Sequence, residues 1–133
     1  MGERDEQIVA RLRRVYEAFN RGDFDAATEI AHPAIEFVRV GGQPSLHGVD
    51  ALRAWMRPDA FEEQTIEAFE FSVNENRVLV RQRARARGAG SGIEVDVDFW
   101  SVWTLDEDGL ATRLEFYLDH QRAEALEAAG LQE

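Results

Sequence analysis

Between residues 77 and 119, charged and apolar side chains alternate strictly along two consecutive segments of the chain. Arginines occupy every second position of 81–87, and acidic residues occupy every second position of 94–98. Alternation with a period of two is typical of a β-strand that has two unlike faces. Because a glycine-rich run over 88–92 separates the segments, we expect a hairpin with one charged and one apolar face.

The charges also predict how the two strands are aligned. Opposite charges stabilise an antiparallel pair of strands by about 0.2–1 kcal/mol for each cross-strand pair. They favour the register that places Arg85 opposite Asp96 and Arg83 opposite Asp98. We therefore expect the charged face to point outward and the apolar face to line the interior, where any pocket must lie.

The rest of the pattern predicts helices early in the chain and strands late. Apolar positions at helical spacing indicate helices, and glycine, aspartate and proline residues delimit them. The expected order is helix 4–20, helix 24–31, strand 35–40, helix 49–56, strands 65–73, 77–87, 93–105 and 110–118, and helix 119–129. This grouping predicts an α+β fold with helices on one face of a mainly antiparallel sheet.

Alternation assigns the side chains of the last two strands to faces, because the charged residues point outward. The inward set contains Phe99, Ser101, Trp103 and Phe116. Aromatic residues of the earlier elements join them: Tyr16, Phe19, Phe37 and Trp55. Gln82 is a lone polar residue among the inward positions of its strand. Two interpretations stay open, since these side chains either line an apolar cavity for a ligand or only fill the core.

The outward positions of the same strands include three large side chains. Trp100, Val102 and Tyr117 share this face with the charged residues. An exposed apolar patch with a charged rim is typical of a protein–protein interface. We therefore expect a homodimer that forms through the outer face of the sheet.

The composition limits the classes of partner and chemistry. A length of 133 residues fits a single domain over 1–133, and the net charge of −11 argues against nucleic acids and anionic membranes as partners. The chain has no cysteine, and its three histidines lack metal-ligand spacing, so we expect neither a metal nor another cofactor. Without a long apolar run or a leader, a cytoplasmic protein is expected.

Three titratable residues are candidates for acid–base catalysis. Glu36 would favour its neutral form and act as an acid or base if it faces an apolar pocket, but it is a rim carboxylate otherwise. His47 is a proton shuttle at the pocket mouth or a loop residue that precedes the helix 49–56. Asp119 is a carboxylate at the opening of the pocket or the N-cap of the last helix.

Five stretches spread over nearly the whole chain resemble one known family. They are Tyr16-Glu-Ala-Phe-Asn-Arg-Gly-Asp-Phe-Asp-Ala-Ala27, His32-Pro-Ala-Ile-Glu-Phe37, Gly48-Val-Asp-Ala-Leu-Arg-Ala-Trp55, Val102-Trp-Thr-Leu105 and Arg113-Leu-Glu-Phe-Tyr-Leu-Asp119. The chain is similar in these stretches to the SnoaL-like branch of the nuclear-transport-factor-2-like superfamily. The resemblance implies a curved sheet wrapped around N-terminal helices, a cone with an apolar pocket, and frequent dimerisation through the outer sheet face.

Known enzymes of this superfamily supply a comparison by position. Ketosteroid isomerases resemble the chain in topology, but Val38 stands where they have an aspartate base, and Ser101 stands where they have an acidic oxyanion donor. Their helix-one tyrosine falls near Val15 or, one position further, at Tyr16. Enzymes similar to limonene epoxide hydrolase use an Asp–Arg–Asp set that points into the pocket. Arg83 and Asp98 match two of these residue types, but the alternation places both on the outer face of the sheet.

The resemblance leaves two classes of function open, because the superfamily contains isomerases, cyclases, hydrolases, dehydratases and non-catalytic binders. In the first, acid–base isomerisation, cyclisation or hydration of a small hydrophobic molecule uses Glu36, His47 or Asp119, with Tyr16 or Ser101 as hydrogen-bond donor. In the second, the domain binds a ligand or dimerises without catalysis. An inward carboxylate paired with histidine would favour the enzyme, and the missing isomerase acids favour the binder.

Overall fold

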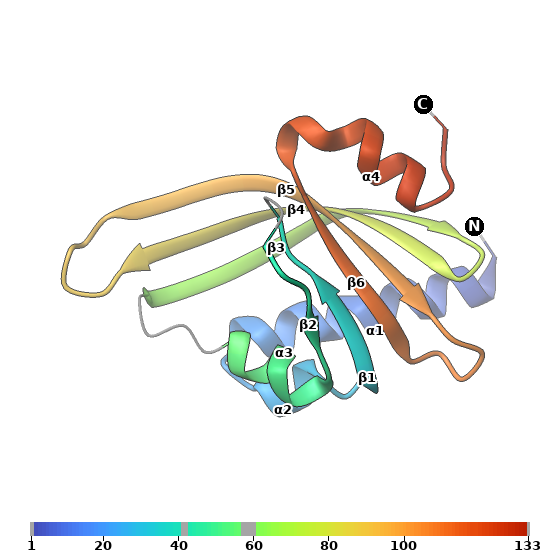
Figure 1. The fold of residues 1–133 in the computed structure, drawn as a ribbon, viewed down its shortest axis with the longest axis horizontal. Coiled ribbons are helices and arrows are strands. Elements are labelled where there is room, and N and C mark those ends of the chain that lie inside the picture. The colour runs from blue at the N-terminus through green and yellow to red at the C-terminus, as the bar shows by residue number, and fades with distance from the viewer. Residues whose placement is uncertain (1, 41–42, 57–60, 133) are drawn as a thin grey trace.

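The computed structural model describes residues 2–40, 43–56 and 61–132 and has the expected α+β fold (Figure 1). Its helices are α1 (Glu3–Asn20), α2 (Phe24–Ala27), α3 (Val49–Trp55) and α4 (Arg122–Ala128), with a 3-10 turn, η1 (Asp119–Gln121), before α4. Its strands are β1 (Ala31–Val38), β2 (Leu46–His47), β3 (Phe61–Asn74), β4 (Arg77–Gly88), β5 (Glu94–Leu105) and β6 (Ala111–Leu118). None of the described helices is long and apolar enough to cross a membrane.

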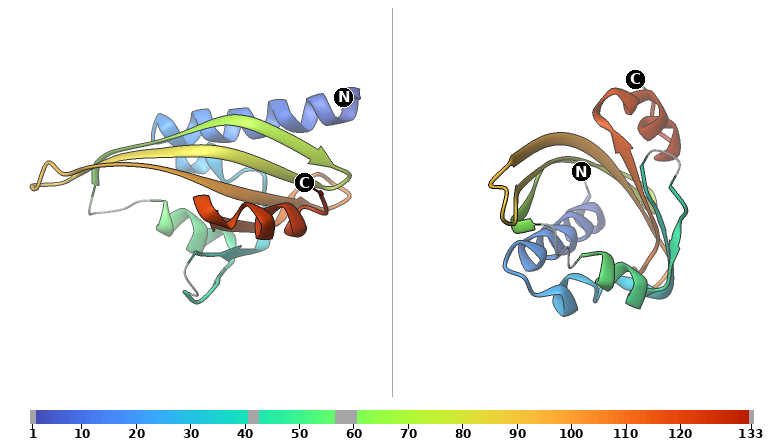
Figure 2. Two further views of the ribbon diagram at one scale, coloured as in Figure 1. Left: turned by 90° about the horizontal axis from the view of Figure 1, so that it is seen from above. Right: turned by 60° about the vertical axis from the view of Figure 1, so that its left-hand side comes forward.

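The six strands form one curved sheet in the order β2-β1-β6-β5-β4-β3. β1 pairs with β6 in parallel, and the other neighbouring strands pair antiparallel, so the expected mixed sheet is confirmed. Figure 2 shows the sheet bending around α1, which lies along its concave face. Leu12, Val15 and Phe19 of α1 are buried against this face and form the main core with inward residues of the sheet.

The register predicted from the charges is confirmed. Arg83 lies opposite Asp98, and Arg85 lies opposite Asp96. The Arg83 guanidinium is 2.6 Å from the Asp98 carboxylate, whereas the Arg85–Asp96 ion pair is longer, at 3.6 Å. The hydrogen bond from Arg83 lowers the pKa of Asp98. Because these side chains stay partly exposed, water screens their attraction, and the ion pairs set the register more than they stabilise the fold.

The Arg83→Ala substitution is expected to change the free energy of unfolding only slightly at pH 7. The lowered pKa of Asp98 makes the ion pair stabilising above the pKa of an unfolded aspartate, about 4, and that contribution disappears as the pH falls through the folded pKa. Urea melts of both proteins at pH 7 and at about pH 2 should therefore show a small difference that shrinks in acid. A severe loss at pH 7 would mean that Arg83 is buried.

The helix expected over 24–31 is shorter, and the strand that follows it begins earlier. The Thr28 hydroxyl donates to the carbonyl oxygens of Phe24 and Asp25, at 2.8 and 3.2 Å, and α2 ends at Ala27. Such side-chain bonds offer the backbone an alternative to continuing a helix. The pairing of β1 with β6 shifts register between residues 31 and 36, around a proline that has no N–H to donate. The short strand β2 lies in the segment expected to be a loop.

The prediction of an exposed apolar patch on the outer face is wrong, because α4 covers these side chains. Trp100 is 9% exposed and Val102 is fully buried, and both pack against Ala125 and Leu126 of α4. Figures 1 and 2 show α4 on the convex side of the sheet, opposite α1. The apolar stripe of the last helix needs a partner surface, and these outward side chains provide it. The expected homodimer therefore loses the apolar patch on which it was based.

Candidate functional site

Four polar side chains meet inside the apolar core, between α1 and the concave face of the sheet. Gln82 and Ser101 are fully buried, and Tyr16 and Trp103 are almost so. The hydroxyls of Tyr16 and Ser101 each lie 2.7 Å from the Gln82 side-chain oxygen Oε1. The Trp103 indole Nε1 donates to the Tyr16 oxygen at 3.1 Å. These contacts form one connected network that links α1 to strands β4 and β5.

The network determines which way the Gln82 amide points. Both hydroxyl protons need an acceptor, and Oε1 accepts both. If the amide were turned by half a rotation, Nε2 would donate to the two hydroxyls. These hydroxyls lie 3.2 Å apart, so one could donate to the other, but the second proton would have no acceptor among the groups of the network. The satisfied arrangement therefore places Oε1 in the network and leaves Nε2 free of it.

The amide nitrogen Nε2 of Gln82 is buried and has no hydrogen-bond partner among the residues that the structure describes. Gln82 lines a small cavity of about 30 Å³ between α1, α3 and the sheet. Six aromatic residues contribute to the walls: Tyr16, Phe19, Phe37, Trp55, Trp103 and Phe116. An unpaired buried donor is unusual in a native core, so it marks this cavity as the candidate site.

The aromatic side of the cavity is closed by rings that contact one another. The Phe37 ring centre lies 4.6 Å from that of Trp55 and 5.0 Å from that of Phe116, and Phe99 packs on Phe116 at 5.2 Å. A volume of about 30 Å³ holds about one water molecule. A larger ligand needs the rings to move, and Trp55 and Phe116 are only partly buried, so they are the side chains best placed to turn aside.

The polar groups of the cavity keep one protonation state near neutral pH. Burial is the main cause that raises the pKa of Tyr16 to about 12, and the contacts of its hydroxyl with the Ser101 hydroxyl, 3.2 Å away, and the Trp103 indole only partly oppose it. An amide, a serine hydroxyl and an indole do not titrate in this range. These polar groups can therefore donate hydrogen bonds to a ligand without a change in their own protonation state.

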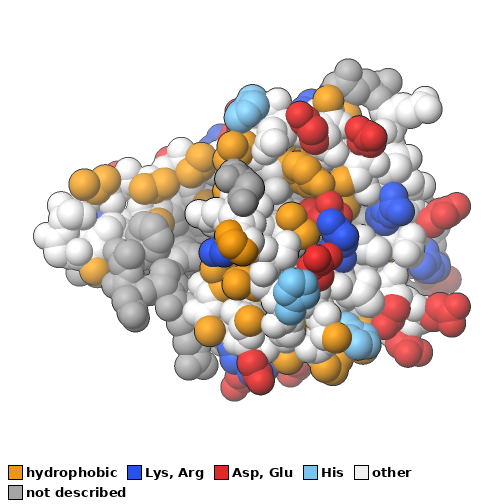
Figure 3. Space-filling view, viewed as in Figure 1, with side chains coloured by type: hydrophobic (Ala, Val, Ile, Leu, Met, Phe, Trp, Pro, Cys, Tyr) orange, Lys and Arg blue, Asp and Glu red, His pale blue; other side chains and the backbone are white. Residues whose placement is uncertain are grey.

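The three candidate acid–base residues lie outside this cavity. Glu36 and His47 are together on the outer side of the sheet, 3.6 Å apart, and Arg113 forms a 3.0 Å ion pair with the same carboxylate. Asp119 forms an ion pair with Arg81 and is exposed. Figure 3 shows acidic, basic and histidine side chains side by side on the surface around β1, β2 and β6. In the described ranges, no cluster of three or more His, Asp or Glu side chains is arranged to hold a metal ion.

The residues predicted to contact a ligand are largely brought together. The inward assignment places Ser101 in the polar network and most of the aromatic candidates in the cavity wall, while Phe99 supports Phe116 from the side. Gln82 was not among the candidate site residues. Its signal was present in the sequence, as the lone polar side chain at an inward position of an otherwise arginine-bearing strand.

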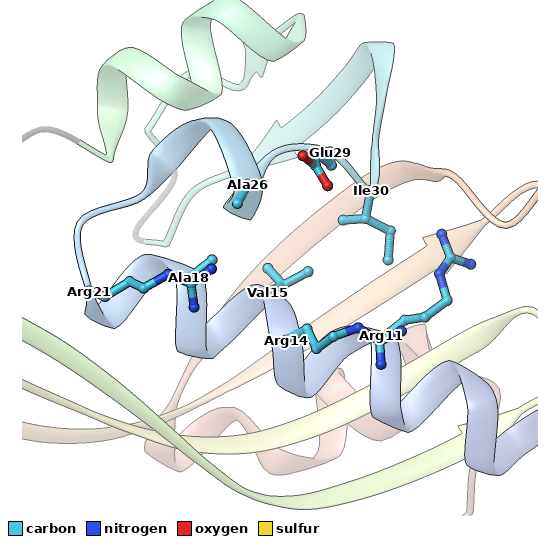
Figure 4. A pocket seen from close by; sticks show the side chains of 8 residues that line it. All are labelled: Arg11, Arg14, Val15, Ala18, Arg21, Ala26, Glu29 and Ile30. Atoms are coloured by element: carbon cyan, nitrogen blue, oxygen red, sulfur yellow. The ribbon is translucent and has the colours of Figure 1, made fainter.

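A larger but open hollow lies on the other side of α1. It has a volume of about 390 Å³, and its rim carries Arg11 and Arg14 from α1, Arg21 directly after α1, and Glu29 from the segment after α2 (Figure 4). Small apolar side chains form its floor, and the arginines are at least partly exposed. The hollow has a charged rim, whereas the smaller cavity has mainly apolar and aromatic walls and contains the unpaired amide, so the smaller cavity has the stronger chemical signal for a specific, largely apolar ligand.

Comparison with known proteins gives a family and a fold. The chain matches the family model described as a SnoaL-like domain over residues 12–114. No curated protein sequence matches it. Many solved structures share the fold.

Three of these structures show what kinds of protein share the fold. The epoxide hydrolase/cyclase-like enzyme SalBIII, which has a role in pyran ring formation in the polyether salinomycin, is 19% identical, with 88% of this chain and 94% of that chain covered and a TM-score of 0.78. A putative SnoaL-like polyketide cyclase from Jannaschia sp. CCS1 is 18% identical, with 96% of this chain and 94% of that chain covered and a TM-score of 0.75. An LEH-like epoxide hydrolase from M. tuberculosis is 14% identical, with 93% of this chain and 92% of that chain covered and a TM-score of 0.73. Identities this low show a shared fold alone.

Proposed function

Because the chain belongs to the SnoaL-like domain family, we propose that it binds a small, largely apolar molecule in the cavity between α1, α3 and the sheet. The observation that carries the proposal is the fully buried amide of Gln82, whose Nε2 has no partner among the described residues and which lines an aromatic cavity. Small-molecule sites in proteins are mostly apolar, with a few polar groups that orient the ligand.

The described polar groups of the cavity support binding over acid–base catalysis. Isomerisation or cyclisation by proton transfer needs a group that changes protonation near the working pH. The Tyr16 hydroxyl, with a pKa of about 12, stays protonated, and Glu36 and His47 pair with each other on the outer side of the sheet. SalBIII and the M. tuberculosis protein are named as enzymes that act on small organic molecules, which agrees with a small-molecule ligand without extending their chemistry to this chain.

The three tryptophans allow the binding site to be located without any substitution. Trp55 and Trp103 line the cavity, whereas Trp100 lies on the opposite face, beneath α4, where its indole donates to the Asp119 carbonyl at 3.2 Å. Acetophenone is a suitable probe, because it is small, aromatic and largely apolar. We expect its titration to shift the indole N–H signals of Trp55 and Trp103 in ¹⁵N-edited NMR spectra, with saturation.

The same spectra contain the control. Because Trp100 lies on the convex side of the sheet, its indole signal should stay in place throughout the titration. Shifts at Trp100 alone, or no saturable shift at any indole, would mean that the proposed cavity is not a binding site.

A further inference from the structure

We propose that Gln82 is the recognition group of the cavity and that the ligand presents to it a neutral acceptor oxygen without a proton of its own, as a ketone or another carbonyl compound does. This inference rests on the proposed binding function and names the chemistry of the ligand. It depends on three features of the network: an unpaired donor, a fixed orientation, and acceptor atoms that are already occupied.

The unpaired donor is the first feature. Gln82 has no exposed surface, and its Nε2 has no hydrogen-bond partner in the described part of the chain. A buried donor without a partner weakens the folded state, whereas a ligand oxygen in the cavity would satisfy it. A ligand that carries an acceptor oxygen can therefore gain affinity by pairing with a donor that the protein itself leaves unpaired among the described residues.

The fixed orientation is the second feature. Two hydroxyls, from α1 and from β5, hold Oε1 at 2.7 Å, and they lie 3.2 Å from each other, so the amide cannot rotate to offer its oxygen without leaving one of the two protons unsatisfied. Donation to Oε1 also polarises the amide and strengthens its N–H groups as donors. The amide is thus pre-organised as a donor, and little conformational entropy is lost when a ligand oxygen arrives.

The occupied acceptors are the third feature, and they select the type of oxygen. The Gln82 Oε1 accepts from two hydroxyls, and the Tyr16 oxygen accepts from the Trp103 indole. An alcohol could accept from Nε2, but the Ser101 oxygen does not line the cavity, so the proton of the alcohol would have to compete for acceptors that the network already uses. A carboxylate would be buried beside no cation among the described lining residues, which is strongly unfavourable. A carbonyl oxygen meets neither difficulty.

A matched set of probes tests this selection. Acetophenone, α-methylbenzyl alcohol and isopropylbenzene have nearly the same shape and differ in the group placed against the amide. Their dissociation constants follow from the Trp55 and Trp103 indole shifts described above. We expect the ketone to bind about tenfold or more tightly than the alcohol and the hydrocarbon, since each of these leaves one buried polar group unpaired.

The substitution Gln82→Met keeps the length of the side chain and removes the donor. It should abolish the preference for the ketone, whereas the matched change Gln7→Met on the exposed side of α1 should preserve it. Equal binding of ketone and hydrocarbon by the wild-type protein would overturn the inference while leaving the binding function intact, and this comparison needs no variant to fold. A preference that survives Gln82→Met would also overturn it. Failure of all three probes to bind would reject the binding function and the inference together.

Discussion

Val102→Asp is expected to lower the free energy of unfolding by about 4 kcal/mol, enough to unfold much of a domain of ordinary stability. Val102 has no exposed surface and lies beneath α4, where it packs with Trp100 against Ala125 and Leu126. A carboxylate there would be desolvated between the sheet and the helix without a designed partner. Urea or thermal melts followed by far-ultraviolet circular dichroism measure the loss.

Val97→Asp on the same strand is the matched control. Val97 is 45% exposed, so the same change of side chain should alter stability by no more than about 0.5 kcal/mol. If both variants were equally stable, α4 would not cover the outer face in solution, and the patch containing Trp100 and Val102 would again be available to a partner.

The second large effect is expected in the buried network. Tyr16→Phe removes the acceptor of the Trp103 indole and one donor to Gln82, and Gln82→Met removes the acceptor of two hydroxyls. Each change should lower the free energy of unfolding by about 2–3 kcal/mol, because it leaves buried polar groups unpaired. The double variant should lose less than the sum of the single losses, by about 1 kcal/mol or more, since the residues share a hydrogen bond.

Denaturant melts of the four proteins in this cycle give the coupling, and Gln7→Met serves as a surface control that should change stability little. Strict additivity of the two losses would contradict the network, because it would mean that Tyr16 and Gln82 stabilise the fold independently. In that case the amide would have no fixed direction.

The sheet could be predicted from the sequence in detail because its information is local and periodic. Alternation assigned inward and outward faces, and the opposite charges of Arg83 and Asp98 fixed the register of the central hairpin. Both signals depend only on neighbouring positions along two strands. The same assignment correctly brought Ser101 and Trp103 into the interior, where they join the polar network.

The outer face could not be predicted in the same way. Alternation shows that Trp100 and Val102 point away from the main core, but it does not show whether another element packs on them. That depends on the path of the chain after β6, where η1 turns α4 back over the sheet. The face of Glu36 was ambiguous because each face of its predicted strand contains apolar residues and one charged residue, with Phe37 and Arg39 on one face and Glu36 and Val38 on the other.

The central property of the candidate site is a matter of hydrogen-bond geometry. The sequence shows that Gln82 is polar and inward, but only the coordinates show that Tyr16 and Ser101 both donate to its oxygen and leave its nitrogen unpaired. These residues are 66 and 19 positions away along the chain. A lone polar residue in an apolar stripe is therefore a useful sequence signal whose meaning depends on its distant neighbours.

A crystal structure of the protein with bound acetophenone would show directly whether Gln82 recognises the ketone. We expect the ring among Trp55, Phe37 and Phe116 and the ketone oxygen at about 3 Å from the Gln82 nitrogen, with Oε1 still accepting from both hydroxyls. A ketone bound in the cavity with its oxygen directed away from Gln82, or bound only on the outer face of the sheet, would contradict it.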